Sequence, residues 1–430
     1  MSGQRKKRAF PGWLRLDNAA KIYPAARSRK WMALFRVSIT LKEPVDDAIL
    51  QKALRQLIKR VPLLSYRLRR GLFWYYFDWH ESQPAVQPDA RNPMLPIDLK
   101  ENGGFLFRVR SFDRRIALEV FHALTDGTGG MTFLLTLTAE YLRLKYGTRI
   151  PEAPMILDMR DEPSREEWED AFLRYARHAV RPRREENAWH LGGVREEPGY
   201  LNITTGHIPT KALSALAREK GCSVNSLLAA LLLGALIQAR AQARRPGKRP
   251  VKLSMPVNLR RFYPTSTLRN FSSYVNVPVY TDYGDYSLEE LISLAAHTMG
   301  LETLEPLINA RFSANVKAER NWLIRVSPLF LKSAVLKFMY RATGESYMTS
   351  TLSNLGLIRL PPEMERHCER VELLLGAGKR TPLACAVASA CGSTAVNFTK
   401  TVKNTAVERA FFTQLVQLGV PVLIESNWRE

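Results

Sequence analysis

Two side chains that could move a proton stand four residues apart near the end of the first third of the chain. His122 and Asp126 lie in segment 121–130, which continues into a glycine-rich stretch. A histidine held in place can remove a proton from a hydroxyl, thiol or amine near neutral pH. The aspartate could fix the turn by pairing with an arginine, or it could orient the imidazole directly. No Gly-x-Ser-x-Gly elbow occurs, so a serine hydrolase would lack its nucleophile.

A strand and a helix are predicted on either side of this pair. Apolar residues alternate over 116–121, a pattern that predicts a half-buried strand. If the strand continues through residue 122, His122 shares the inward face of Ile116, Leu118 and Val120. After Gly130 apolar residues recur at helical spacing, and Gly147 stands where a helix C-cap is expected. The sequence therefore predicts a strand, a turn and a helix, with functional groups at the end of the strand.

Length predicts two domains, because 430 residues exceed one typical core. Segment 158–189 is charge-dense and lacks a strong apolar stripe, which predicts an exposed helical linker. We expect one unit over 1–194, which contains the His122 segment, and a second over 195–430. The hydrophobic content of 46% and charged content of 24% are ordinary for a globular protein and argue against disorder, collagen or a coiled coil.

Other elements are expected along both halves. A helix should follow the acidic pair Asp46 and Asp47 and end at Pro62, and Ser223 is a candidate N-cap for a buried helix. Pro278 predicts an edge strand. Strands are expected over 35–41, 72–77, 106–110, 251–257, 275–279, 371–375, 384–390 and 394–399, and helices over 213–217, 288–299, 322–339 and up to residue 419.

The four cysteines have neither metal-ligand spacing nor a disulfide pattern. We therefore expect no metal site, and we expect a reducing, cytoplasmic location. The longest apolar run, over 227–237, is expected to be too short to cross a bilayer. A monomer is expected.

A formal net charge of +22 will draw anionic partners toward the surface. Three interpretations stay open: a solvated basic surface, a phosphate-bearing cosubstrate or acidic carrier protein, and nucleic acid. No recognised nucleic-acid module accompanies the charge, so specific nucleic-acid binding is not expected. Contact with an anionic membrane surface is compatible with it.

The segment Phe121-His122-Ala123-Leu124-Thr125-Asp126-Gly127 resembles the His-His-x-x-x-Asp-Gly signature of the coenzyme A-dependent acyltransferase superfamily. The stretches 13–24, 258–260 and 353–356 fit this resemblance, which covers nearly the whole chain and is greatest for the bacterial alcohol acetyltransferase branch. It implies an α/β fold in which two chloramphenicol-acetyltransferase-like sandwich subdomains form a V around a central tunnel. Acyl-CoA would be a cosubstrate, with no permanently bound cofactor.

The resemblance also implies roles for individual residues. His122 would deprotonate the hydroxyl of a small molecule or lipid, which would attack the acyl carbonyl without a covalent acyl-enzyme. Asp126 would be structural and paired with Arg260, with Arg15 as the rival, and Gly127 would permit the turn. Ser353 or Asn354 would stabilise the oxyanion or line the tunnel.

Two departures from the family pattern leave alternatives open. Phe121 replaces the first histidine of the signature, and the Asp-Phe-Gly-Trp-Gly motif of several branches is absent. The main prediction is an acyl-CoA-dependent O-acyltransferase. The alternative is a noncatalytic or carrier-protein-dependent, condensation-like protein that binds acyl or peptidyl partners.

Overall fold

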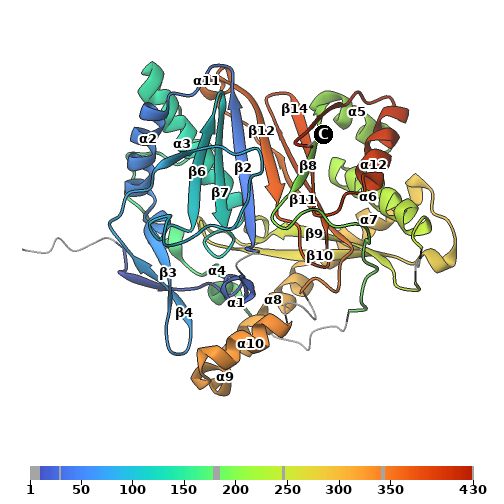
Figure 1. Ribbon diagram of the computed structural model, residues 1–430, viewed down its shortest axis with the longest axis horizontal. Coiled ribbons are helices and arrows are strands. Elements are labelled where there is room, and N and C mark those ends of the chain that lie inside the picture. Colours follow the sequence, from blue (N-terminus) through green and yellow to red (C-terminus); the bar gives the residue numbers. More distant parts are fainter. Residues whose placement is uncertain (1–9, 29–30, 178–184, 245–246, 340–343, 429–430) are drawn as a thin grey trace, which may run out of the picture.

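The computed structural model describes residues 10–28, 31–177, 185–244, 247–339 and 344–428. Figure 1 shows two main sheets side by side, with helices on their outer faces. In the five-stranded sheet the order is β12 (Cys368–Leu375), β2 (Leu34–Leu41), β7 (Arg115–Phe121), β6 (Phe107–Phe112) and β5 (Val86–Pro88). In the seven-stranded sheet it is β10 (Ser272–Val279), β9 (Val251–Asn258), β11 (Ser350–Leu357), β13 (Leu383–Ala390), β14 (Ser393–Lys400), β8 (Asn202–Pro209) and β15 (Leu423–Ser426). The predicted α/β class is confirmed.

Two long helices cover the five-stranded sheet: α2 (Asp47–Arg60) and α3 (Gly127–Tyr146). Asp46 caps α2, its carboxylate accepting from the backbone N–H groups of Ala48 at 2.9 Å and Ile49 at 3.0 Å. Gly147 ends α3 in the left-handed region, at φ 69°. The predicted C-cap at Gly147 is confirmed, and α3 starts earlier than expected, because residues 127–130 form its first turn.

The seven-stranded sheet is covered by α5 (Thr210–Glu219), α6 (Val224–Ala241), α7 (Leu288–Glu302) and α12 (Ala406–Gln417). Ser223 caps α6 as predicted, accepting from Ser226 N–H at 3.0 Å. The described residues include this one helix that is long and apolar enough to cross a membrane, which corrects the expected length. Because α6 packs against α7 and α12 and is mostly buried, it has the character of a core helix.

One strand of the five-stranded sheet comes from the C-terminal half of the chain. β12 pairs antiparallel with β2, so that Val371 faces Ile39 and Leu373 faces Val37 across the ladder. A cut near residue 195 therefore does not separate the strands of the two main sheets. Sequence periodicity cannot reveal this arrangement, because it depends on strand partners more than 300 residues apart.

Several local expectations need correction. The strand expected over 72–77 is the hairpin β3 (Tyr66–Arg70) and β4 (Tyr75–Trp79), in a small sheet with β1 (Trp13–Arg15). The expected helical linker over 158–189 has only two short helical turns, η2 (Arg165–Trp168) and α4 (Ala171–Tyr175), because a helix without a packed apolar face gains little in water. Its residues 178–184 lie outside the described part of the chain. The predicted edge strand at Pro278 is confirmed in β10.

The helix expected over 322–339 is divided at Pro328, which cannot continue a helical hydrogen-bond ladder. Its two parts, α9 (Trp322–Val326) and α10 (Leu329–Met339), follow α8 (Glu305–Arg320). Together they project from one end of the molecule, beside the β3–β4 hairpin (Figure 1). The short helix α1 (Ile22–Ala26) packs against α10.

Candidate active site

His122 is the first residue after β7, so the strand ends one position before the histidine. Its backbone N–H donates to the carbonyl of Ala33 at 2.8 Å, which anchors the chain at the end of this central strand. The imidazole stacks on Tyr23 of α1 with ring centres 4.8 Å apart, and the ring of Phe35 meets it edge-on at 5.2 Å. The side chain is therefore held on two sides while it stays only half-buried.

The imidazole is also held by an amide from the other half of the chain. His122 Nδ1 lies 3.0 Å from Asn270 Oδ1, and Asn270 Nδ2 donates to Asp17 Oδ2 at 3.2 Å. Because the carboxylate of Asp17 takes the NH₂ group, the amide presents its oxygen to the imidazole, and this oxygen can only accept. The network thus assigns the proton to Nδ1 and leaves the lone pair on Nε2.

Asp17 is fully buried at the far end of this chain of hydrogen bonds. It accepts from Ala20 N–H at 2.7 Å, and Arg269 Nε lies 3.5 Å away. Burial raises the pKa of Asp17, although the charge of Arg269 opposes this effect. Burial also raises the pKa of the Tyr23 hydroxyl, so the ring that stacks on His122 is neutral.

Both carboxylate oxygens of Asp126 make structural contacts. Its Oδ1 caps α3 by accepting from Gly129 N–H at 3.0 Å. Its Oδ2 accepts from Arg260 Nη1 at 2.8 Å and from Phe271 N–H at 2.9 Å. Burial alone would raise the pKa of Asp126, but Arg260 and the two N–H donors hold it below its usual value. Asp126 is therefore a buried anion that joins the two halves of the chain.

Arg260 is the predicted partner of Asp126, and it also organises the loop that carries Asn270. Arg260 Nε donates to Thr267 O at 3.0 Å, and its Nη2 donates to Arg269 O at 2.5 Å. The rival, Arg15, instead has its carbonyl bound by Arg269 Nη2 at 2.6 Å. The ion pair thus fixes the segment just before Asn270, so Asp126 and His122 are positioned by the same loop.

The glycines of the motif serve close packing. A Cβ at Gly129 would overlap the Thr125 hydroxyl and lie 2.5 Å from Leu268 O, and a Cβ at Gly130 would lie 2.5 Å from the Phe35 ring. Gly127 does not have a positive φ, so the expected conformational role is not needed there. A Cβ at Gly127 would lie 3.4 Å from the Leu355 side chain of β11, so the segment 353–356 lies beside the start of α3.

The segment 353–356 lies at a bulge in β11, where the register of β11 with β13 shifts between Asn354 and Leu357. Asn354 Oδ1 accepts from Gly356 N–H at 2.7 Å, and its Nδ2 donates to Asn225 Oδ1 at 3.3 Å. Both ends of the Asn354 amide therefore stabilise the bulge. Ser353 is half-buried on the same strand and is the better candidate for contact with a ligand.

The sequence interpretation did not single out three of the residues that hold His122. Asp17 and Tyr23 occurred only within the matching stretch 13–24, and Asn270 lies outside the matching stretches. The sequence feature that could have indicated Asp17 is a polar pair, Asp17 and Asn18, within an apolar segment. The partners could not be assigned, because Asn270 is 148 residues from His122 and 253 from Asp17.

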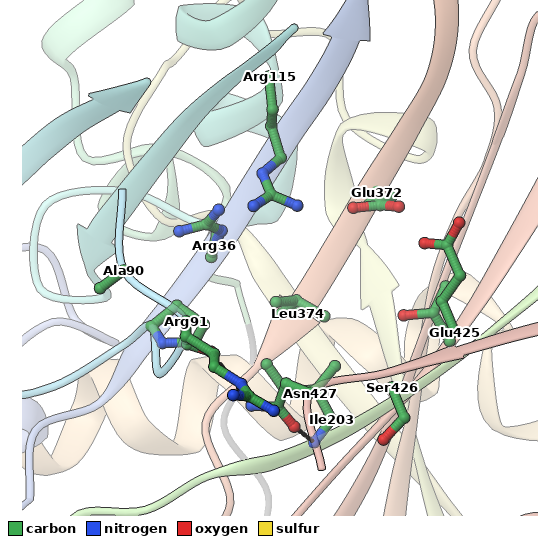
Figure 2. A pocket seen from close by; sticks show the side chains of 12 residues that line it. Arg36, Ala90, Arg91, Arg115, Ile203, Glu372, Leu374, Glu425, Ser426 and Asn427 are labelled. Carbon is green, nitrogen blue, oxygen red and sulfur yellow. Dashed lines mark hydrogen bonds between the residues drawn. The ribbon is translucent and has the colours of Figure 1, made fainter. Parts of the chain in front are cut away.

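Two pockets among the described residues lie away from His122, and the predicted tunnel stays a prediction. One is a cavity of about 260 Å³ between the two main sheets (Figure 2). Its lining is charged and includes Arg36, Arg91, Arg115, Glu372 and Glu425.

Beside this cavity, His207, Glu372 and Glu425 lie close enough together to hold a metal ion. However, Arg370 already contacts both carboxylates, with its Nε 3.2 Å from Glu372 and its Nη2 3.3 Å from Glu425. A metal ion would have to displace this guanidinium from the oxygen atoms that it needs.

Comparison with known proteins supports the fold. A family model described as the C-terminus of phthiocerol/phthiodiolone dimycocerosyl transferases matches residues 198–267. No curated protein matches the chain. Polyketide synthase associated protein 5 from Mycobacterium tuberculosis superposes with a TM-score of 0.61 at 16% identity, covering 95% of this chain and 98% of that one.

Two further structures cover nearly the full length. The first condensation domain of the CDA synthetase has a TM-score of 0.58 at 16% identity, over 96% of this chain and 99% of that one. A trichothecene 15-O-acetyltransferase from Fusarium sporotrichioides has a TM-score of 0.60 at 11% identity, over 94% of both chains. The predicted resemblance is confirmed at the level of the fold, which this chain shares over nearly its full length with a condensation domain and an O-acetyltransferase.

Proposed function

We propose that this protein is an acyltransferase that moves an acyl group from an acyl thioester, acyl-CoA, to an alcohol hydroxyl, with His122 as the general base. The fold and the matching family model support acyl transfer as the class of reaction. The observation that carries the proposal is the fixed imidazole: Asn270 holds Nδ1 at 3.0 Å, so Nε2 is the atom left to accept a proton.

In this mechanism Nε2 of His122 takes the proton of the acceptor hydroxyl as its oxygen attacks the thioester carbonyl. The tetrahedral intermediate collapses with loss of the coenzyme A thiolate. The thiolate then takes the proton from the imidazolium. The products are an ester and a free thiol. No covalent acyl-enzyme is required, since the acceptor oxygen itself is the nucleophile.

The other site residues support this step without taking part in proton transfer. Asp126 and Arg260 hold the two halves of the site together, and Asn270 orients the base. Ser353 is our candidate donor to the oxyanion, because the Asn354 amide is already engaged at both ends. The net charge of +22 would favour the encounter with an anionic acyl-CoA.

The test is a screen of acyl donors and acceptors that follows release of free thiol. Acetyl- and longer acyl-CoA would be combined with a panel of alcohols, and mass spectrometry would identify the ester. We expect His122→Ala to reduce turnover by about 10²–10⁴-fold, the usual contribution of a general base, with an unchanged circular dichroism spectrum. His297→Ala, on the exposed face of α7, is the matched control.

Wild-type turnover in His122→Ala would reject the general-base role. Transfer from a carrier-protein thioester but not from acyl-CoA would replace the proposed donor with the carrier-bound one. Absence of transfer from either donor, together with binding of acyl compounds, would support the noncatalytic alternative.

A further inference from the structure

One end of the molecule exposes an apolar surface that no other described element covers. It consists of the tip of the β3–β4 hairpin and the outer faces of α9 and α10, which lie together in Figure 1. We name it the α10 surface. Its large side chains are between 42% and 74% exposed: Leu72, Phe73, Trp322, Val326, Phe330, Leu331, Val335 and Phe338. A contiguous apolar patch of this kind marks a contact with a partner or a membrane.

The hairpin and α10 form one surface, because they are joined by specific contacts. Leu329 N–H donates to Leu72 O at 2.9 Å, and Lys332 Nζ donates to Phe73 O at 3.0 Å. The Lys332 ammonium also lies 3.7 Å from the centre of the Trp74 ring. The apolar side chains from the two segments therefore present a common face.

The segments that carry these side chains are rich in positive charge. Segments 66–77 and 322–339 contain six arginine and lysine residues and no aspartate or glutamate. Arg69, Arg70, Arg325 and Lys337 are exposed among them. The hairpin also contains one acidic residue, Asp78 of β4, which contacts Arg67 at 2.8 Å and Arg69 at 3.4 Å. The α10 surface thus combines apolar groups with a net positive charge.

This combination selects among the candidate partners. A second copy of the chain would bring two cationic surfaces together, which is unfavourable for a symmetric contact. Nucleic acid would match the charge but would leave the aliphatic side chains in water. An anionic lipid bilayer matches both, since apolar side chains enter the acyl boundary while arginine and lysine meet the headgroups.

We propose that the α10 surface binds the protein reversibly to anionic membrane surfaces. The position of the surface links it to the candidate active site, because α10 packs on α1, and α1 carries the Tyr23 ring that stacks on His122. A docked molecule would hold the His122 site close to the bilayer, where acceptors or acyl chains of low water solubility reside. Docking itself does not depend on the proposed catalysis.

The test is cosedimentation of the purified full chain with vesicles. Phosphatidylcholine vesicles would be compared with vesicles that also contain phosphatidylglycerol, at low and high salt. We expect binding to the anionic vesicles, weakened by salt, and a loss of at least about tenfold in affinity for Phe330→Ser/Phe338→Ser. Arg70→Glu/Lys337→Glu should lose binding to anionic vesicles in the same assay.

Matched controls come from α12, whose Val416 is 56% exposed and whose Arg409 is also exposed. Val416→Ser and Arg409→Glu should bind vesicles like the parent protein. Melting curves check that each variant is folded. The proposal is rejected if the parent does not sediment with anionic vesicles, or if folded Phe330→Ser/Phe338→Ser binds as tightly as the parent. A dimer that this double variant converts to a monomer, without vesicle binding, would assign the surface to self-association instead.

Discussion

The region around His122 and the charged cavity of Figure 2 both lie where the two halves of the chain meet, and they use their polar groups in opposite ways. Around the cavity, charged groups pair with one another: Arg36 contacts Asp89 at 2.5 Å and Glu119 at 3.1 Å, and Glu119 also meets Arg108 and Arg110. At His122 the partner is a neutral amide, which leaves one ring nitrogen for proton transfer.

Asp89 at the cavity and Asp170 on the His122 side show opposite pKa shifts. Near the cavity, Arg36 and Arg115 lower the pKa of Asp89 to about 2 in spite of its burial. On the His122 side, burial, with the charge of Asp17 in addition, raises the pKa of Asp170 to about 6. The dense ion pairing around the cavity therefore indicates a structural role, whereas the oriented His122, with one ring nitrogen left, indicates a role in proton transfer.

The largest effect is expected from Arg260→Ala. It should lower the free energy of unfolding by about 3–5 kcal/mol, because Asp126 would be left as a buried charge without its partner. Arg115→Ala, beside the cavity, is the matched control: Arg115 is 37% exposed and Asp89 keeps Arg36, so about 1 kcal/mol or less should be lost. Urea denaturation measures both. Equal losses in the two variants would contradict the contrast between the regions.

Asn270→Ala should reduce kcat by about tenfold or more, because the imidazole loses the acceptor that fixes its tautomer. Asn276→Ala in β10 is the matched control, since Asn276 donates to Glu185 at 2.6 Å and does not contact His122. A positioning role predicts a change in kcat and in the pH profile with little change in KM. A rise in KM alone would point to substrate binding, and an unchanged kcat would remove Asn270 from the site.

Asp170→Asn should stabilise the protein at pH 7. The folded-state pKa of about 6 exceeds the ordinary value of 3.8, so the native state binds the proton more tightly and loses stability as the pH rises from about 4 to about 6. Asparagine removes this loss and keeps the side-chain oxygen that caps α4 by accepting from Phe172 N–H at 3.1 Å.

The measurement is the melting temperature of both proteins across this pH range. The difference between Asp170→Asn and the parent should be absent near pH 4 and reach its full size above pH 6. Asp89→Asn should change the melting temperature in the opposite direction. The pKa of the wild-type Asp89 carboxyl is lowered, so this carboxylate stabilises the fold above about pH 4 and loses that effect as the pH falls toward 2. A pH-independent difference for Asp170→Asn would contradict the assigned shift.

The smallest effect is expected from Glu425→Gln at the edge of the cavity. Glu425 is 47% exposed and contacts Arg370 at 3.3 Å, so its loss should cost about 1 kcal/mol or less. Denaturation at low and high salt would measure the change. A loss of several kcal/mol would mean that the cluster of His207, Glu372 and Glu425 holds more of the fold together than its exposure indicates.

Local sequence patterns determined the elements that carry the site. Alternation over 116–121 predicted β7, and the helical spacing with Gly147 predicted the body and end of α3. The N-cap of α6 followed from Ser223, and the start of α2 followed from the acidic pair Asp46 and Asp47. These features depend on interactions within a few residues, so they are encoded where they occur. The motif resemblance added the Asp126–Arg260 pair, which the structure contains at 2.8 Å.

Only the tertiary structure decided which groups surround the base and which strands share a sheet. The links from His122 to Asn270 and Tyr23, the pairing of β12 with β2, and the meeting of the hairpin with α10 all join segments that are distant in sequence. Such contacts depend on the packing of whole subdomains, and no local period records them. The sequence alone thus determined that a histidine stands at the end of a strand; the assembled fold decided that its Nδ1 is anchored and its Nε2 is left to act.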